Sequence, residues 1–102
     1  MTRSAEEGSS SEYRIFETDE LARSLRRLAS SDAAFLAGKL RSHVYPQLRA
    51  NPYLGPHIRK LRGYKPPTWR YRVGRYRVFY LVDDGPGIVF ILTVDDRKDA
   101  YR

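Results

Sequence analysis

The pattern around Gly74-Arg75 constrains the fold of this chain more than any other feature. Residues 68–73 and 76–82 flank this pair, and aromatic or apolar side chains alternate with arginines immediately before it. Alternation of this kind has the period of a β-strand. A glycine at the first position of a two-residue connection favours a type II′ turn. The sequence therefore predicts a β-hairpin in which Arg72 lies opposite Arg77.

The two faces of the predicted hairpin differ in chemistry. One face, which we expect to pack on helices, carries Trp69, Tyr71, Val78 and Tyr80. The other face carries Arg70, Arg72 and Arg77 above Phe79 and Leu81. Directly opposed like charges repel each other, so the pair formed by Arg72 and Arg77 needs an anion to hold it. A phosphate backbone is the best candidate for this anion, and a solvated strand face is the alternative.

The distribution of charge along the chain favours anion binding. The 50 residues from 33 to 82 contain no carboxylate and 11 lysines or arginines, in a chain of net charge +7. Arginines outnumber lysines by 15 to 4, and arginine binds phosphate bidentately and stacks on bases. This balance indicates a polyanionic partner: nucleic acid, an acidic protein or an anionic membrane surface.

Before the hairpin, the sequence predicts a short strand and two helices. Residues 1–11 are expected to be a disordered tail and residues 12–16 a strand. Thr18 can cap a first helix, and Ser30-Ser31-Asp32 is expected to break that helix and cap the second. Pro46 should kink the second helix or end it nearby. The apolar stripes expected to face the core are Leu21, Leu25 and Leu28, followed by Ala33, Leu36, Ala37, Leu40, Val44 and Leu48.

After the helices, residues 51–56 predict a loop, which residues 57–67 continue as a basic connection. Three antiparallel strands are then predicted, at residues 68–73, 76–82 and 88–94. The last is apolar on both faces and is placed centrally in the sheet, and residues 95–102 are expected to be a polar tail. The predicted fold is α+β: an N-terminal strand, a helical hairpin and an antiparallel three-strand meander (β-α-α-β-β-β), in one domain over residues 12–102.

Composition and residue spacing exclude several classes of function. The chain has no cysteine, which removes disulfides and cysteine-based metal sites. No apolar run approaches the roughly 20 residues of a membrane span, and the N-terminus lacks the apolar stretch of a signal peptide. His43 and His57 have no carboxylate at metal-ligand spacing, so we expect no metal and no cofactor. We expect a cytoplasmic protein with no membrane partner and no small-molecule substrate.

Three stretches, in this order and at this spacing, carry a resemblance to a known family. They are Asn51-Pro52 with Gly55 and Lys60-Leu61-Arg62-Gly63, then residues 69–78 (WRYRVGRYRV), then residues 97–102 (RKDAYR). Together they resemble the RelE/ParE superfamily, the toxin half of bacterial and archaeal toxin–antitoxin pairs, over residues 12–102. The resemblance implies a RelE-like fold and an acidic antitoxin as partner. RelE-like members are ribosome-dependent endoribonucleases that cut mRNA, so it also implies the ribosome and mRNA as partners.

The resemblance implies a set of site residues as well. The catalytic residues of RelE-like members, basic side chains on the sheet and a C-terminal tyrosine, correspond here to Arg70, Arg72, Arg77, Arg97 and Tyr101. Tyr101 could stack on a base or take a proton. Further contacts to nucleic acid are expected from Arg62, Lys65, Arg75 and Lys98. Such a site would cleave RNA without a metal, by attack of the 2′-OH on the adjacent phosphate.

The sequence departs from the family pattern at two places. Asp95-Asp96 stands where many relatives have Gly-His or Gly-Lys, and carboxylates there would repel phosphate and partly neutralise Arg97. Arginine replaces lysine at Arg70 and Arg72, and arginine does not release a proton at useful pH. Two alternatives to the nuclease stay open: a ParE-like inhibitor of DNA gyrase, and a non-catalytic RNA- or antitoxin-binding module of the same fold.

Overall fold

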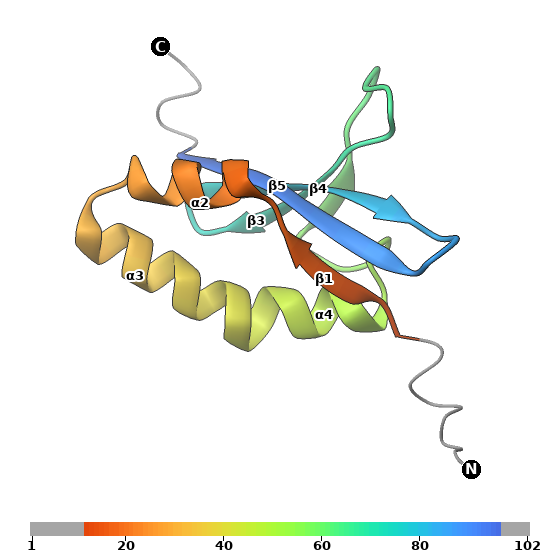
Figure 1. Cartoon of the computed structure of the whole chain (residues 1–102), viewed down its shortest axis with the longest axis horizontal. Coiled ribbons are helices and arrows are strands. Elements are labelled where there is room, and N and C mark those ends of the chain that lie inside the picture. The colour runs from red at the N-terminus through yellow and green to blue at the C-terminus, as the bar shows by residue number, and fades with distance from the viewer. Residues whose placement is uncertain (1–11, 97–102) are drawn as a thin grey trace.

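The computed structural model describes residues 12–96, so the predicted tails at 1–11 and 97–102 lie outside the described residues. In this part of the chain, one five-stranded sheet packs on a layer of helices (Figure 1). In chain order the elements are β1 (Arg14–Glu17), α2 (Asp19–Arg26), α3 (Ser30–Lys39), the π-helical segment η1 (Leu40–Val44), α4 (Tyr45–Ala50), β2 (Ile58–Lys60), β3 (Trp69–Val73), β4 (Tyr76–Asp83) and β5 (Ile88–Asp96). The α+β class is as predicted.

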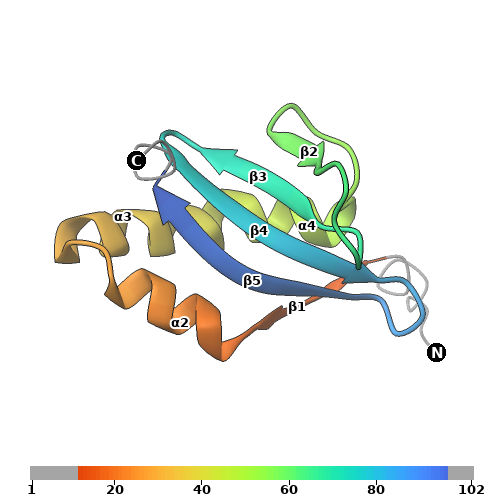
Figure 2. The ribbon, with the colours of Figure 1, turned by 90° about the horizontal axis from the view of Figure 1, so that it is seen from above.

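The strands follow the order β1-β5-β4-β3-β2 across the sheet (Figure 2). β5 lies between β1 and β4, which confirms the interior position that its two apolar faces predicted. β1 pairs with β5 in parallel, whereas the other three pairs are antiparallel. The expectation of a wholly antiparallel sheet was wrong for β1, because helices rather than a tight turn connect it to the other strands and no hairpin fixes its direction.

The segment 57–67, predicted as a loop throughout, contains the edge strand β2. This strand pairs with β3, with Ile58 opposite Tyr71, and the Arg72 N–H donates to the His57 carbonyl at 3.0 Å. Three residues are too few for alternation to reveal a strand. β2 is extended because it completes the hydrogen bonds of a neighbouring strand, which is information that local sequence does not carry.

The β3–β4 hairpin has the predicted register, with Arg72 opposite Arg77. Gly74 begins the turn with a φ of 59°, a backbone conformation that glycine adopts without steric cost. The predicted division of the two faces is also confirmed. The helix-facing residues are Tyr71, Val78 and Tyr80, which are buried, and Trp69, which is partly buried against the core.

Helix α2 begins as predicted and is held against β5. The Thr18 side chain accepts a hydrogen bond from the Leu21 N–H at 3.2 Å, which is the expected cap. The Thr18 hydroxyl also lies 2.8 Å from the Ile91 carbonyl of β5. Further along the helix, the buried Ser24 hydroxyl accepts from the Val94 N–H at 3.1 Å. These contacts fix the helix across the end of the sheet where the basic residues of β3 and β4 lie.

The second helix differs from its prediction at its N-terminus, and of the two outcomes predicted at Pro46, a kink or an end, the end is wrong. Its N-cap is Ala29, with no side-chain cap, and Asp32 lies inside the first turn. Pro46 does not end the helix, because the π-helical segment η1 precedes it and α4 continues to Ala50. The wider π turn relieves the clash that a proline ring makes with the preceding turn. No helix within residues 12–96 is long and apolar enough to cross a membrane.

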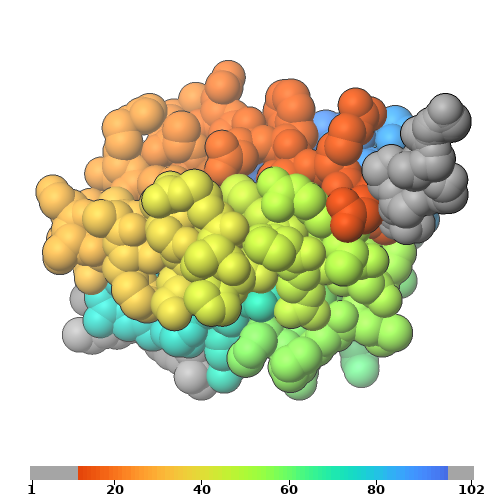
Figure 3. All heavy atoms as spheres, turned by 90° about the horizontal axis from the view of Figure 1, so that it is seen from below, coloured from red at the N-terminus to blue at the C-terminus, as the bar shows by residue number. Residues whose placement is uncertain are grey.

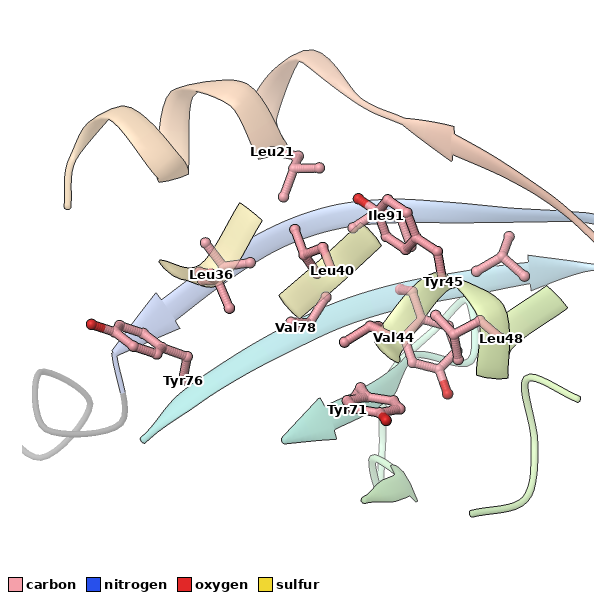
Figure 4. Packing of buried hydrophobic residues seen from close by; sticks show 13 residues of the cluster. Leu21, Leu36, Leu40, Val44, Tyr45, Leu48, Tyr71, Tyr76, Val78 and Ile91 are labelled. Atoms are coloured by element: carbon pink, nitrogen blue, oxygen red, sulfur yellow. The ribbon is translucent and has the colours of Figure 1, made fainter. Parts of the chain in front are cut away.

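The core lies between the sheet and the continuous α3–η1–α4 rod. Figure 3 shows this rod, in yellow and green, crossing the helical face of the molecule. Beneath it, the second predicted stripe supplies four side chains that are at most 2% exposed, Leu36, Leu40, Val44 and Leu48. They pack on Tyr71, Val78 and Ile91 of the sheet (Figure 4). Burial of each leucine contributes about 1.5–3 kcal/mol, so this layer keeps the sheet in place while its other face stays open.

Strand β5 extends beyond its predicted end. Asp95 and Asp96, expected in a polar tail, pair in the β4–β5 ladder with Arg77 and Tyr76. Apolar patterning stops at Val94, but the ladder continues because opposite charges face each other across the two strands. Asp95 therefore lies on the open face and Asp96 on the helical face, and each has an arginine within reach.

Candidate nucleic-acid interface

Two cross-strand pairs of arginines lie on the open face of the sheet, and we call these four residues the arginine grid. Its members, from β2, β3 and β4, are Arg59, Arg70, Arg72 and Arg77. Arg59 lies opposite Arg70, and Arg72 opposite Arg77. Sequence reasoning did not place Arg59 here, because the segment that carries it was expected to be a loop. The three predicted sheet arginines do share one face.

Three members of the arginine grid, Arg59, Arg70 and Arg77, border a groove of about 560 Å³ on the open face. Phe79 lies opposite Arg70 and forms part of an apolar floor. The remaining lining comes from the grid, from β5 and from the segment between β2 and β3, namely Arg59, Leu61, Tyr64, Thr68, Arg70, Arg77, Leu92, Thr93 and Asp95. A second depression beside it brings Arg72 and His57 next to Arg59 and Arg70. Cationic walls over an apolar floor suit a ligand that has both anionic groups and flat apolar surfaces.

A carboxylate of the chain itself already binds one of the opposed arginines. Asp95 holds Arg77 through two hydrogen bonds, from Nε at 3.0 Å and from an Nη at 2.9 Å. The guanidinium of Arg77 also lies 5.5 Å from the centre of the Phe79 ring. The hairpin was expected to need an external phosphate to hold its opposed arginines. Asp95 supplies an internal anion in that place, because β5 continues two residues further than expected.

The Asp95–Arg77 pair is accessible enough to exchange partners. Their side chains are 40% and 26% exposed, and exposed ion pairs contribute only about 0–1 kcal/mol to stability. The sequence predicted that Asp95 and Asp96 would act on Arg97. Arg97 lies outside the described residues, so that expectation stays a prediction; among residues 12–96, Asp95 forms an ion pair with Arg77 and Asp96 with Arg75.

Arg75, predicted to contact nucleic acid, lies among carboxylates at the hairpin turn. It forms ion pairs with Asp96 at 3.0 Å and with Asp32 of α3 at 3.2 Å. The pKa of Arg75 is raised above its ordinary value, first by its hydrogen bond to the Tyr76 hydroxyl and then by the charge of Asp96. These contacts tie the turn to the helical layer, and Arg75 does not line the groove of the arginine grid.

The other predicted site residues fall into two groups. Arg62 and Lys65 lie on the segment between β2 and β3, beside the groove. Arg97, Lys98 and Tyr101 lie outside the described residues. Within residues 12–96, no group of three or more His, Asp or Glu side chains is arranged to hold a metal ion.

The opposite end of β4 is fixed by tyrosines. Tyr13 and Tyr53 both donate to the Asp84 carboxylate, at 2.7 Å. These hydrogen bonds, that of Tyr13 first, lower the pKa of Asp84. The pKa of Tyr53 is raised, first by burial and then by its hydrogen bond to Asp84. Sequence reasoning missed this cluster, because its three members are far apart in the chain.

Comparison with known proteins places this chain in a family. The family model described as "ParE toxin of type II toxin-antitoxin system, parDE" matches residues 15–101. The chain belongs to the RelE/ParE toxin superfamily and is a toxin of a type II toxin–antitoxin system. A comparison with curated protein sequences finds no match.

Solved structures show the same architecture. A chain of the RelBE2 toxin–antitoxin complex from Mycobacterium tuberculosis is 28% identical, with a TM-score of 0.64 over 84% of this chain and 99% of that one. A chain of the RelE–RelB complex from Pyrococcus horikoshii is 25% identical, with a TM-score of 0.57 over 84% and 96%. A mutant of Escherichia coli RelE in the free state, 23% identical, has a TM-score of 0.60 over 88% of each chain and shows the fold alone.

Proposed function

We propose that this toxin binds RNA across the arginine grid and cleaves mRNA on the ribosome. The observation that carries the proposal is the grid itself, in which four arginines come from three adjacent strands and three of them, Arg59, Arg70 and Arg77, border one apolar floor. RNA offers the complementary chemistry, since its phosphates accept from guanidinium groups and its bases stack on apolar surfaces. The ribosome would hold the strand in place, so the toxin's own groups need only modest catalytic power.

The proposed reaction is attack of a ribose 2′-OH on the adjacent phosphorus. A new P–O bond forms, the bond to the 5′-oxygen breaks, and the products are a 2′,3′-cyclic phosphate and a 5′-OH. A base takes the 2′-OH proton and an acid protonates the departing oxygen. Arg70 and Arg72 would donate to the non-bridging oxygens, where charge develops in the transition state. Guanidinium groups keep their protons, so their role is electrostatic.

We assign the remaining roles to the C-terminal segment, on the resemblance alone. Arg97 would complete the cationic site, and Lys98 would contact the RNA backbone. Tyr101 would take the 2′-OH proton or stack on a base, and nearby arginines would lower its pKa toward the range in which it can act. Arg62 and Lys65 would contact the strand beside the groove.

We further propose that an acidic antitoxin binds this chain. The relatives from M. tuberculosis and P. horikoshii are toxin–antitoxin complexes. The net charge of +7 favours a partner of opposite sign. Association with such a partner should weaken as salt increases, because exposed charges are then screened.

A cleavage assay tests the proposed nuclease. Ribosomes programmed with a defined mRNA are incubated with the toxin, and new RNA ends are mapped by primer extension. We expect new ends inside the coding region with the wild type. Arg77→Ala and Tyr101→Phe should each slow their formation by about 10²–10³-fold. Absence of cleavage by the wild type on correctly programmed ribosomes would refute the nuclease.

A gyrase inhibitor is the second candidate, favoured by the Asp95–Arg77 pair. A carboxylate on a sheet arginine opposes phosphate binding, and the matching family model is named for ParE. A DNA supercoiling assay with purified gyrase separates the two functions. Loss of supercoiling at toxin concentrations that leave ribosome-bound mRNA intact would support the inhibitor and reject the nuclease.

A further inference from the structure

The segment between β2 and β3, residues 61–67, forms a raised wall beside the arginine grid. In Figure 1 it rises from the sheet on the side away from α3 and α4. Its base is closed by the Leu61 N–H, which donates to the Thr68 carbonyl at 2.9 Å. The Thr68 hydroxyl donates to the Pro66 carbonyl at 3.1 Å. These bonds anchor both ends of the segment, and two of its residues, Leu61 and Tyr64, line the groove.

Tyr64 lies near the tip of this segment and lines the groove. Its side chain is 55% exposed, one of four large apolar or aromatic residues with such exposure in the described part of the chain. The other three are Phe16, Phe35 and Leu54, and none of them lines the groove. Tyr64 is not among the residues packed on the core. Its ring therefore contributes little to stability and presents an aromatic surface in the groove that Arg59, Arg70 and Arg77 also line.

This arrangement has the two parts that single-stranded RNA requires. A positively charged groove follows the backbone, and an aromatic ring stacks on a base. The grid supplies the cations, from Arg59 and Arg70 across to Arg77. Tyr64 supplies the ring, from the segment that follows Arg59 and β2 in the chain. A tyrosine is suited to this task, because it offers a rigid flat surface at low cost in side-chain entropy.

We infer that Tyr64 is a substrate-binding residue that stacks on a base of the RNA whose phosphates lie on the arginine grid. The inference rests on the proposed RNA binding and adds a base contact from outside the sheet. Stacking on a tyrosine requires a base but accepts any of the four. The contact would therefore fix the position of one nucleotide along the groove with little selection of sequence.

Equilibrium binding of a short single-stranded RNA tests the inference. Fluorescence anisotropy gives the Kd for an 8-nucleotide oligonucleotide with the wild type, Tyr64→Ala, Tyr64→Phe and Phe35→Ala. We expect Tyr64→Ala to raise the Kd by about 5- to 150-fold, the range for one stacked base. Tyr64→Phe should bind as the wild type does, since it keeps the ring. Phe35→Ala is the matched control, an exposed aromatic residue on α3.

Two further readouts separate stacking from a structural effect. The slope of log Kd against log salt should be equal for the wild type and Tyr64→Ala, because no phosphate contact is lost. With an abasic oligonucleotide of the same length, the two proteins should bind equally. Equal Kd values for the intact RNA, or a difference that persists on the abasic strand, would overturn the inference. The ribosome cleavage assay is independent: RNA binding that depends on Tyr64 without cleavage would reject the nuclease and leave this inference standing.

Discussion

The β4–β5 hairpin carries a pair of aspartates at each end, and the two pairs have different partners. At the turn, Asp84 accepts hydrogen bonds from two neutral tyrosines. At the open end, Asp95 and Asp96 accept from the cationic Arg77 and Arg75. Both ends are fixed by hydrogen-bonded carboxylates, yet only the open end lies beside a surface that can bind anions.

The difference follows from what each partner can do after the bond is broken. A tyrosine that no longer donates to Asp84 is a neutral group. Its release mainly loosens the contacts that join Tyr13 and Tyr53 to the β4–β5 turn. Arg77 released from Asp95 is a cation on an open face, next to Arg72. The tyrosine end is therefore expected to affect stability. The arginine end is expected to affect anion binding.

The largest effect is expected for Arg72→Ala. Within the described residues Arg72 has no carboxylate partner, so no carboxylate of this part of the chain competes with phosphate for it. Its removal should reduce ribosome-dependent cleavage by about 10²–10³-fold and leave the midpoint of thermal unfolding within about 1–2 °C of the wild type. Arg26→Ala removes an equal charge from an exposed position on α2 and should leave cleavage unchanged. Equal losses in both variants would mean that only total charge matters.

Asp95→Asn should produce a smaller change of opposite sign. The substitution keeps the size of the side chain but removes the charge that binds Arg77, so RNA should bind about 3- to 10-fold more tightly. The slope of log Kd against log salt should become steeper by about 0.7 if one more phosphate is contacted. Asp19→Asn removes the same charge from α2 as a control. Unchanged binding by Asp95→Asn would show that Asp95 does not compete with RNA for Arg77.

At the tyrosine end, Tyr53→Phe should reduce the alkaline loss of stability. The pKa of Tyr53 is raised above its ordinary value of 10.0, first by burial. Its stabilising effect is therefore complete below pH 10 and declines above it, because the unfolded chain ionises first. The free energy of unfolding, measured with a chemical denaturant, should decrease less between pH 9 and pH 11 for Tyr53→Phe than for the wild type. Tyr45 and Tyr80 also have raised pKa values, so part of the loss should remain.

The sequence predicted those parts of the fold that depend on local periodicity. Alternation around Gly74 gave the correct hairpin register, and the leucine stripes gave the buried helical faces. It failed at β2, which has three residues and is extended only because β3 lies beside it. It also failed at Asp95, because a strand end set by cross-strand charge pairing has no apolar signal. Both failures concern pairing partners that are distant in the sequence.

The same dependence on distant pairing partners explains which residues of the candidate site could be predicted from the sequence. Arg70, Arg72 and Arg77 were assigned to one face because a two-residue turn fixes their register. Arg59 was missed with β2, and Tyr64 was missed because a loop residue reveals no orientation by itself. The clusters at the two hairpin ends each join residues that are 18 or more positions apart, and only the folded chain brings them together.

The smallest effect is expected for Asp84→Asn, at acidic pH. Hydrogen bonds from Tyr13 and Tyr53 lower the pKa of Asp84 below its ordinary value of 3.8. A lowered pKa means that the ionised form is favoured in the folded state, so its contribution is present above pH 3.8 and is lost as the pH falls further. The free energy of unfolding should decrease less between pH 5 and pH 2.5 for Asp84→Asn than for the wild type.

Asp83→Asn is the matched control for this measurement. Asp83 is exposed and adjacent, and among the hydrogen bonds of residues 12–96 its side chain accepts only a local one, from the Gly85 N–H. Its substitution should leave the acid-induced loss as in the wild type. RNA binding should stay unchanged in both variants, because neither residue lies near the arginine grid. If Asp84→Asn altered RNA binding as much as Asp95→Asn, the two ends of the hairpin would be coupled, and the division between a stabilising end and a binding end would fail.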